Sequence, residues 1–297
     1  AALKSGEDFK VLSLNAFCRP PGIKNKANDW KSERLEYLAQ HEMVNHDIVA
    51  FQELFGTFSG RRDAFLEKIA QAGHGYYVTS PKPSWKHLID GGLAITSKYP
   101  IVEAKWSPFA PGMHSDRLAE KGILYAKIAL DAANGRFLHV FNAHTQSSYN
   151  DPVGSASWKI RERQTTHMLD FIEETAHDSS PLLLMGDLNI DARKEMPKNT
   201  SSAEYLAFVQ LLRNMKFTPS KKLTSTNSTF YVCDVLFDFN GNAHPVTFGD
   251  AKKSSTGEIE PLETCFTKPH DYGSFQSLDY IFFAVPAPSD VKKQAAQ

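Results

Sequence analysis

Polar residues that can hold a metal ion or a phosphate group recur along this chain at the ends of short apolar runs. The runs and the polar residues after them are residues 11–14 with Asn15, 48–51 with Gln52 and Glu53, 137–141 with Asn142 and His144, and 182–185 with Asp187 and Asn189. A further run, residues 278–283, contains its own carboxylate, Asp279. Carboxylates, amides and an imidazole suit a hard cation and an anionic substrate rather than a redox metal.

Each of these residues also has an ordinary structural explanation. An Asn after a strand commonly forms an Asx-turn, a single Glu is commonly a solvated charge, and a single His is commonly a half-buried structural residue. Taken one at a time, the structural explanation is favoured. Because the residues recur in order after apolar runs, and because open α/β folds bind ligands at strand ends, the whole set predicts one assembled site.

Strand and helix patterns alternate along the chain and predict a single α/β domain over residues 1–297. Asp29 is the expected N-cap of a helix that reaches Met43, and Ser59 is the expected N-cap of a helix that stops at Gly73. Further helices are expected near residues 158–172 and 205–212, and further strands at residues 93–95, 123–130 and 229–239. No internal repeat or linker interrupts this pattern.

Composition limits the classes of protein that fit. The 297 residues are 41% hydrophobic, which is enough for a large core. The 33 Lys and Arg residues nearly balance the 34 Asp and Glu residues, so no overall attraction to nucleic acid is expected. The 3 Cys residues cannot form a disulfide framework, and no apolar run approaches the ~20 residues that span a bilayer. Compartment is left open, with a membrane-peripheral or secreted protein favoured over a nuclear one.

The ordered set resembles the endonuclease/exonuclease/phosphatase superfamily of Mg-dependent phosphodiesterases, also called DNase I-like. The resemblance runs from about residue 9 to residue 283, and Gly-Asp-x-Asn is its most specific single motif. The motifs that carry it are Leu14-Asn15, Gln52-Glu53, Asn142-Ala143-His144, Gly186-Asp187-Leu188-Asn189 and Leu278-Asp279-Tyr280. The resemblance implies a four-layer α/β sandwich, in which two mixed β-sheets pack face to face and helices flank both outer sides.

Within that superfamily, the chain is most similar to the neutral sphingomyelinases. Residues 90–100, which begin Asp90-Gly91-Gly92, match a stretch typical of sphingomyelinases and related phospholipid hydrolases, and Asp90 is included among the expected catalytic residues. Residues 116–125 resemble the Lys-Gly segment of that group. The resemblance implies that Asp116 and Lys121 form a switch that gates the active site. The alternative is an ordinary exposed ion pair, which stabilises little.

The resemblance also implies a role for each strand-end residue. Glu53, with Asn15, would hold Mg²⁺ against a phosphate oxygen. His144 and Asn189 would donate hydrogen bonds to the phosphoryl oxygens, and Asp187 would orient the attacking water. The expected reaction is hydrolysis of sphingomyelin to ceramide and phosphocholine.

Asp279 would hold the general-base His in its working tautomer, and here the chain departs from the family. The family's base is the His of a Ser-Asp-His tripeptide, whereas residues 289–291 read Ser-Asp-Val and no His follows His270. Either the chain stops short of its final strand, which is favoured, or the site has lost its base. His270 and His244 lie in loops ahead of Asp279 and are disfavoured as replacements.

Three functions are compared. The first is a monomeric sphingomyelinase that docks on a membrane surface through exposed aromatics, with Trp85 and Trp106 as candidates; core packing is the alternative for both, and it is favoured for Trp106. The second is a nuclease of the same fold, which the balanced charge disfavours because DNA binding needs a cationic face. The third is a binding protein that has kept the pocket and lost the base.

Overall fold

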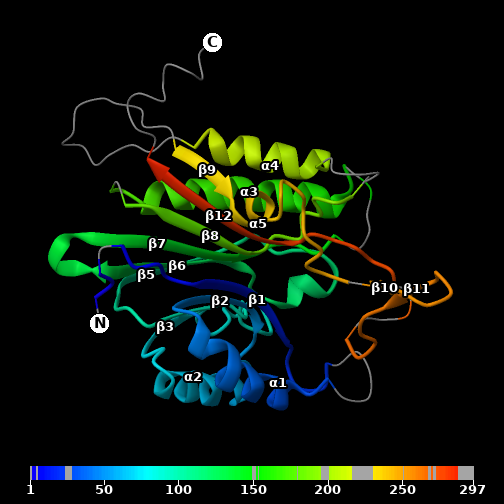
Figure 1. Cartoon of the computed structure of the whole chain (residues 1–297), viewed down its shortest axis with the longest axis horizontal. Coiled ribbons are helices and arrows are strands. Elements are labelled where there is room, and N and C mark those ends of the chain that lie inside the picture. Colours follow the sequence, from blue (N-terminus) through cyan, green and yellow to red (C-terminus); the bar gives the residue numbers. More distant parts are fainter. Residues whose placement is uncertain are drawn as a thin grey trace, which may run out of the picture.

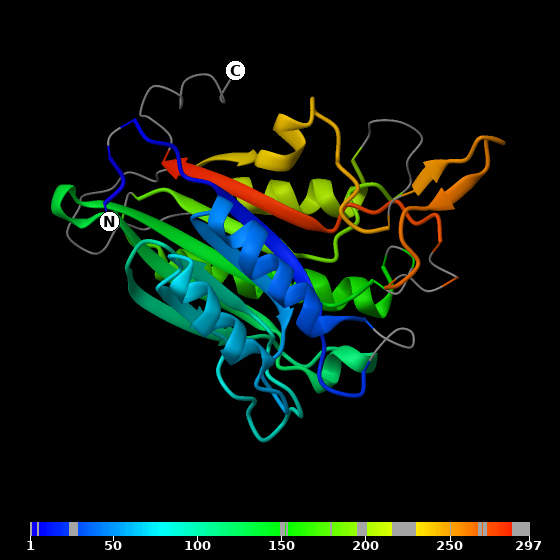
Figure 2. The same cartoon turned by 60° about the horizontal axis from the view of Figure 1, so that its bottom comes forward.

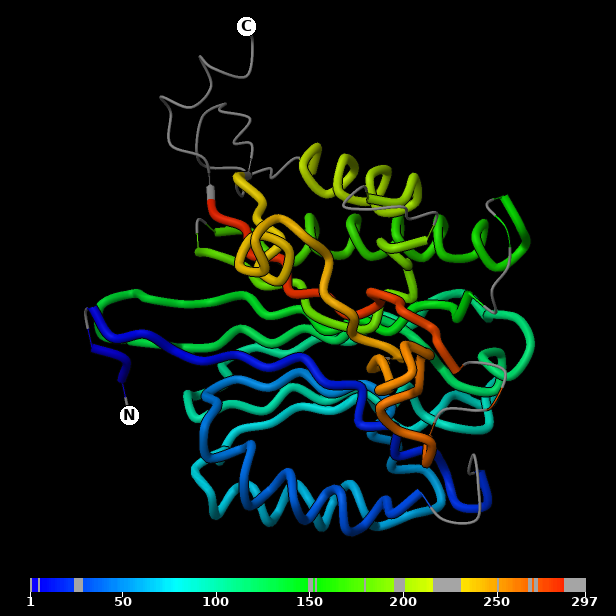
Figure 3. The backbone as a smooth tube through the Cα atoms, turned by 45° about the vertical axis from the view of Figure 1, so that its right-hand side comes forward, coloured from blue at the N-terminus to red at the C-terminus, as the bar shows by residue number. Residues whose placement is uncertain are grey.

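Two β-sheets lie face to face at the centre of the molecule, with helices over both outer sides (Figure 1). The structure is a computed structural model. It describes residues 2–4, 6–23, 29–148, 152, 154–178, 180–194, 201–215, 230–249, 251–266, 269 and 272–286. The tube in Figure 3 shows the same succession of helix, strand, strand and helix layers from the side. The predicted four-layer α/β sandwich is confirmed.

The smaller sheet has the strand order β1-β2-β4-β3. Its strands are β1 (Val11–Cys18), β2 (Ile48–Leu54), β3 (Tyr76–Thr79) and β4 (Ala94–Ser97). The edge strand β1 runs parallel to β2, so the carboxyl ends of both strands reach the same edge of the sandwich. The register shifts between Asn15 and Cys18, which marks a bulge where β1 leaves the sheet.

The larger sheet has the order β5-β6-β7-β8-β12-β9. Its strands are β5 (Ile101–Pro108), β6 (Gly122–Asp131), β7 (Arg136–His144), β8 (Leu182–Asp187), β12 (Asp279–Pro286) and β9 (Phe230–Asp234). Strands β7 and β8 are parallel, whereas β12 runs antiparallel to β8. Because of that reversal, the first residue of β12 lies at the carboxyl end of β8.

Two pairs of helices cover the outer faces. α1 (Lys31–Tyr37) and α2 (Arg61–Gln71) pack on the smaller sheet, while α3 (Ala156–Thr175) and α4 (Ala203–Arg213) pack on the larger one (Figure 1). Ser155 and Ser202 cap α3 and α4 through their hydroxyl oxygens. A separate apolar cluster fills the space between the sheets, where Ile48, Leu93 and Leu124 are buried. Burial on both faces explains why the inner strands are continuous apolar runs.

A polar bridge also joins the two sheets. The Gln52 side-chain NH2 donates to Asn142 Oδ1 at 2.8 Å, and the Asn142 NH2 donates to the carbonyls of Phe51 and Ala94. Both side chains are fully buried. Gln52 and Asn142 therefore tie the layers together, which explains two of the polar strand-end residues without any chemistry.

Several local predictions differ from the structure. Helix α1 begins after Trp30 rather than after Asp29, whose carboxylate instead pairs with Lys31 at 3.0 Å. Helix α2 begins after Gly60, with the Ser59 hydroxyl accepting from the next turn; Gly73, at φ 101°, follows its end as predicted. Residues 229–239 are not one strand, because β9 is followed directly by the short helix α5 (Val235–Phe239).

A small hairpin projects from one end of the molecule (Figure 2). It consists of β10 (Ala251–Lys253) and β11 (Ile259–Pro261), and it pairs with neither main sheet. Cys18, Cys233 and Cys265 are free thiols. Within the described residues, no helix has the length and apolar character needed to cross a membrane. Residues 289–291 and His270 lie outside the described residues.

Candidate active site

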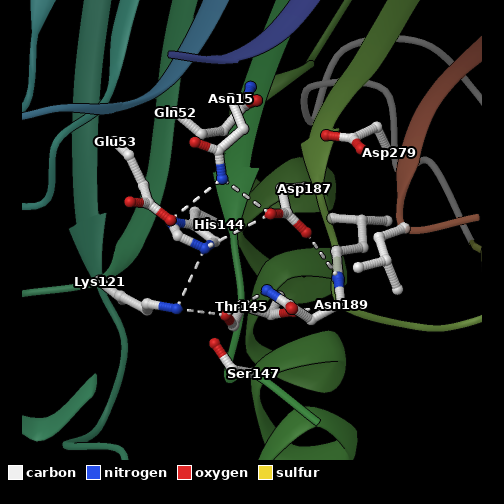
Figure 4. A network of polar contacts seen from close by, with 12 residues as sticks. Asn15, Gln52, Glu53, Lys121, His144, Thr145, Ser147, Asp187, Asn189 and Asp279 are labelled. Atoms are coloured by element: carbon white, nitrogen blue, oxygen red, sulfur yellow. Dashed lines mark hydrogen bonds and ion pairs between the residues drawn. The ribbon is translucent and has the colours of Figure 1, made fainter. Parts of the chain in front are cut away.

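The polar strand ends meet at one edge of the sandwich. The register pairs Asn15 with Gln52 across β1 and β2, and pairs His144 with Asp187 across β7 and β8. The antiparallel register places Asp279, at the start of β12, directly opposite Asp187. These side chains come from five strands of two sheets, and Figure 4 shows them facing one another. One assembled cluster is therefore present.

Asn15 links the two sheets at the centre of this cluster. Its side-chain nitrogen donates to Glu53 Oε1 at 3.1 Å and to Asp187 Oδ2 at 3.0 Å (Figure 4). Its Oδ1 accepts from the backbone N–H of Phe17 at 3.0 Å, which fixes the orientation of the amide. Asn15 thus turns its side-chain nitrogen to both carboxylates, and its expected role beside Glu53 as a Mg²⁺ ligand stays a prediction. It holds the Glu53 and Asp187 carboxylates in place.

The Gly-Asp-x-Asn motif has a backbone that few other residues could adopt. Gly186 has φ 145°, and a Cβ atom there would lie 2.0 Å from the carbonyl oxygen of Ala143 on the neighbouring strand. Asn189 has φ 51°; its N–H donates to Asp187 Oδ1 at 3.1 Å, and its side-chain nitrogen donates to the carbonyl of Thr145 at 3.1 Å. Glu53 is also in the left-handed region, at φ 51°. Strained backbone at two polar residues of one cluster is typical of functional sites.

Lys121 enters the cluster beside His144. Its Nζ lies 3.1 Å from His144 Nε2, 2.7 Å from the Thr145 carbonyl and 3.1 Å from Asp116 Oδ2. An ammonium group can only donate, so His144 Nε2 accepts and the ring proton belongs on Nδ1. That Nδ1 atom is buried and has no hydrogen-bond partner. Leaving it unpaired costs about 1–3 kcal/mol, which marks the imidazole as a group kept for a ligand.

The contact between Lys121 and His144 was not predicted from the sequence, although the pairing of β6 with β7 accounts for it. The register of β6 and β7 pairs Ile123 with Ala143, which brings Lys121 beside Thr145. The Asp116–Lys121 pair is buried rather than exposed. Asp116 also accepts from the Ser147 N–H at 2.7 Å. Burial raises the pKa of Asp116, but the Lys121 charge and this N–H outweigh burial, so that the pKa lies below its ordinary value.

Negative charge is concentrated in the cluster. Desolvation raises the pKa of Glu53, and the charge of Asp187 raises it further, against the lowering effects of Asn15, Lys121 and Arg19. Desolvation and the charge of Asp187 raise the pKa of Asp279 well above its ordinary value. Desolvation and the Lys121 charge also hold the pKa of His144 well below its ordinary value, so His144 is neutral. Buried carboxylates that raise one another's pKa favour a bound cation.

Comparisons with known proteins agree with this geometry. Residues 13–290 match the model of the endonuclease/exonuclease/phosphatase family. The chain belongs to this family. A sphingomyelinase from Dictyostelium discoideum is 31% identical over 97% of this chain and 90% of the relative, which confirms the resemblance seen in the sequence.

Solved structures with the same fold include a β-hairpin deletion mutant of β toxin from Staphylococcus aureus, which aligns with a TM-score of 0.65 and 24% identity. That alignment covers 95% of this chain and 89% of the toxin chain. A second β-toxin mutant, with bound magnesium ions, aligns with a TM-score of 0.58 and 20% identity over 95% of this chain and 100% of the other. These alignments confirm the fold.

The donor set fits a hard cation such as Mg²⁺. Among the residues that the structure describes, no three His, Cys, Asp or Glu side chains enclose a metal position. Mg²⁺ does not need such a cage, because it keeps several waters and is bound through one or two carboxylates plus the substrate phosphate. Glu53, which accepts from Asn15, would supply such a carboxylate.

Asp90 lies in a different hydrogen-bond network from the strand-end cluster. Its Oδ2 accepts from the N–H groups of Gly56 at 3.0 Å and Thr57 at 2.8 Å, and its Oδ1 accepts from Gly92 at 2.8 Å. These contacts fold the loop that leaves β2 directly after Glu53, and the catalytic role expected for Asp90 stays a prediction.

The two candidate docking aromatics differ. Trp85 is 90% exposed, whereas Trp106 is partly buried against the core between the sheets. A Cβ atom at Gly122 would lie 2.6 Å from the Trp106 ring, so that glycine makes room for it. Trp106 is therefore not an exposed docking residue.

In the described part of the chain, no histidine is hydrogen-bonded to Asp279. His244 instead contacts Ser201 at 2.8 Å and packs its ring on Tyr205 and Phe237. This agrees with the expectation that His244 does not replace the family's general base.

Proposed function

We propose that this chain is a Mg²⁺-dependent phosphodiesterase that hydrolyses sphingomyelin to ceramide and phosphocholine. The observation that carries the proposal is the convergence of Glu53, His144, Asp187 and Asn189 on one edge of the sandwich. The named sphingomyelinase from Dictyostelium discoideum, matched along nearly the whole chain, supports the choice of a phospholipid over DNA. The near balance of acidic and basic residues supports the same choice.

During hydrolysis of a phosphodiester, negative charge builds up on the oxygens bound to phosphorus, and the site must stabilise that charge. Mg²⁺ bound at Glu53 would neutralise part of that charge. The His144 imidazole and the Asn189 NH2 would donate to the phosphoryl oxygens. Asp187 lies between them, with each of its oxygens already positioned by an asparagine, and would orient the attacking water. The water oxygen bonds to phosphorus, the bond from phosphorus to the ceramide oxygen breaks, and that oxygen takes up a proton.

We further propose that the substrate is reached on a membrane surface through an apolar rim of Phe58, Trp85, Leu88 and Leu118. These side chains are 76%, 90%, 63% and 42% exposed. The backbone N–H of Leu88 donates to the carbonyl of Leu118 at 3.0 Å, which joins two of the loops. Lys86 Nζ lies 5.4 Å from the centre of the Trp85 ring. Tryptophan beside lysine is typical of proteins that dock at the lipid headgroup level.

The direct test is a mixed-micelle assay with sphingomyelin, phosphatidylcholine and DNA, each with Mg²⁺ or with a chelator. We expect turnover of sphingomyelin that requires Mg²⁺ and is abolished by Glu53→Gln. Glu67→Gln, which changes an exposed carboxylate on α2, is the matched control and should leave turnover unchanged. Cleavage of DNA but not of lipid would contradict the proposal. Binding of lipid without turnover by the full-length protein would instead identify a binding homologue.

A further inference from the structure

A second pocket lies outside the cluster, between residues 109–111 and one face of α3. Its volume is about 70 Å³. Its floor includes the buried side chains of Phe109 and Gln164, and its rim includes the exposed Arg163. His167 completes one wall, where the Ser107 hydroxyl holds its Nε2 at 2.7 Å. The pocket is therefore small, built from both helix and loop, and open to solvent on one side.

Arg163 and Gln164 present donors to this pocket, whose other lining residues are His167 and four apolar residues. No carboxylate is among its lining residues. The Gln164 Oε1 accepts from the backbone N–H of Gln146 at 2.8 Å, so any contact with a ligand would come from its NH2 end. Arg163 uses its Nε on the carbonyl of Lys159, and its two terminal nitrogens form the fork that suits a tetrahedral oxyanion. The guanidinium group at the rim is positively charged, and the amide at the floor donates a hydrogen bond. The pocket therefore favours a phosphate group over a cation.

The pocket is connected to Lys121 by two separate paths. The N–H of Phe109, which lines the pocket, donates to the backbone carbonyl of Lys121 at 2.8 Å. Gln146, which holds Gln164, also accepts from the N–H of Met113 through its Oε1 at 2.8 Å. The segment from Phe109 to Met113 leads directly to Asp116, the partner of Lys121. A ligand packed against this segment would thus fix the backbone that sets the position of Lys121.

We propose that this pocket binds a small phosphate-bearing anion, and that the bound anion holds Lys121 against His144 and slows turnover. An ammonium has three donors, and the contacts of Lys121 with His144 Nε2, the Thr145 carbonyl and Asp116 use all of them, so in this arrangement Lys121 has no donor left for a substrate phosphate. The protein then has two states, one with Lys121 in contact with His144 and one with Lys121 released. An anion that binds the first state more tightly lowers the fraction of molecules with a competent site. The inhibition rests on the lipid hydrolysis proposed above, whereas the binding does not.

Binding is tested first, on the full chain, by calorimetric titration with inorganic phosphate and with phosphocholine. Arg163→Ala should weaken the affinity for at least one of them by about tenfold or more, while Lys159→Ala, which removes a cation one turn away on α3, should change it less than about twofold. Vesicles with and without phosphatidic acid distinguish a lipid phosphate from a free one by the same pair of variants. Equal weakening by both substitutions, or none by Arg163→Ala with every probe, would overturn the site.

Inhibition is tested by steady-state hydrolysis of sphingomyelin at increasing concentration of the anion that binds. We expect kcat to fall with KM unchanged in the wild type and in Lys159→Ala, and no inhibition in Arg163→Ala. Competitive inhibition that is equal in all three proteins would overturn the coupling, because the anion would then act at Glu53 and its neighbours. A wild type that binds the anion but hydrolyses no lipid would contradict the proposed function and leave the binding result standing.

Discussion

His139 and His144 lie on the same strand, β7, yet their surroundings differ in one decisive respect. Both are buried, and each has an aspartate and a lysine nearby. His139 contacts the Tyr125 hydroxyl through Nδ1 at 2.8 Å and Asp178 through Nε2 at 2.9 Å, so both ring nitrogens are paired. His144 has Lys121 on Nε2 and nothing on Nδ1.

The difference follows from the geometry of the strand. Five positions separate the two histidines, so their side chains point to opposite faces of the sheet. His139 faces the layer of α3, where a closed network of neutral and charged partners satisfies it. His144 faces the other sheet, at the edge where the strand ends meet. A buried imidazole with complete pairing stabilises the fold, whereas one with an open nitrogen is retained at a cost and points to chemistry.

The largest effect that separates the two histidines is expected in catalysis. His144→Asn should lower kcat for sphingomyelin by about 10²–10³-fold, because the shorter amide does not hold a donor where the imidazole holds one against the charge developing on the phosphoryl group. Its free energy of unfolding should change less than that of His139→Asn, since only one of the two ring nitrogens of His144 has a partner to lose. Steady-state kinetics and urea unfolding measure the two quantities. Retention of more than a tenth of the wild-type kcat would contradict the role given to His144.

The same substitution at the other histidine should give the opposite result. His139→Asn shortens the side chain in a buried place and removes Nε2, the partner of Asp178, which should lower the free energy of unfolding by about 1–3 kcal/mol. Turnover at saturating Mg²⁺ should stay close to that of the wild type, because Asp178 and Tyr125 are remote from the strand-end cluster. Loss of activity without loss of stability would break the comparison.

The pH dependence of stability should test the comparison of the two histidines further. Burial lowers the pKa of His139, despite the opposing effect of Asp178, so around pH 6 the unfolded chain binds more protons than the folded one at this residue. Stability at this residue is therefore complete above the unfolded pKa of about 6.5 and is lost as the pH falls below it. Urea unfolding of wild type between pH 7.5 and pH 5 should show a decline that is shallower in His139→Asn. Parallel curves would mean that His139 does not titrate on unfolding.

The sequence was sufficient to predict the strands that carry the site, because each apolar run is buried or half-buried and leads into a polar residue. It could not predict the orientation of Asn15, which depends on the N–H of Phe17 across a bulge. It singled out His144, which follows the apolar run, over His139, which lies within it, but it could not show which ring nitrogens have partners. The partners that distinguish them, Asp178 and Lys121, come from elsewhere in the chain.

Asp90 and Trp106 show two outcomes for residues singled out in the sequence. The resemblance to sphingomyelinases locates the segment of Asp90 without showing which atoms its side chain faces, whereas core packing was favoured for Trp106 and is what the structure shows. Asp90 uses its oxygens on backbone N–H groups of the loop after β2, and Trp106 lies over Gly122. The predicted cap at Asp29 differs for a local reason: the Asp29 carboxylate pairs with Lys31, and the helix begins after Trp30.

The smallest effect is expected at the lysine beside His139. Lys127 Nζ lies 2.6 Å from Asp178 Oδ2, but the Asp178 side chain is 42% exposed and keeps His139 as a partner when the lysine is removed. Ion pairs in such positions contribute about 0–1 kcal/mol, so Lys127→Met should lower the free energy of unfolding by less than about 1 kcal/mol. Raising the salt concentration should reduce the difference further, because water screens this pair. A loss as large as that of His139→Asn would mean that the lysine, and not the paired imidazole, holds the network together.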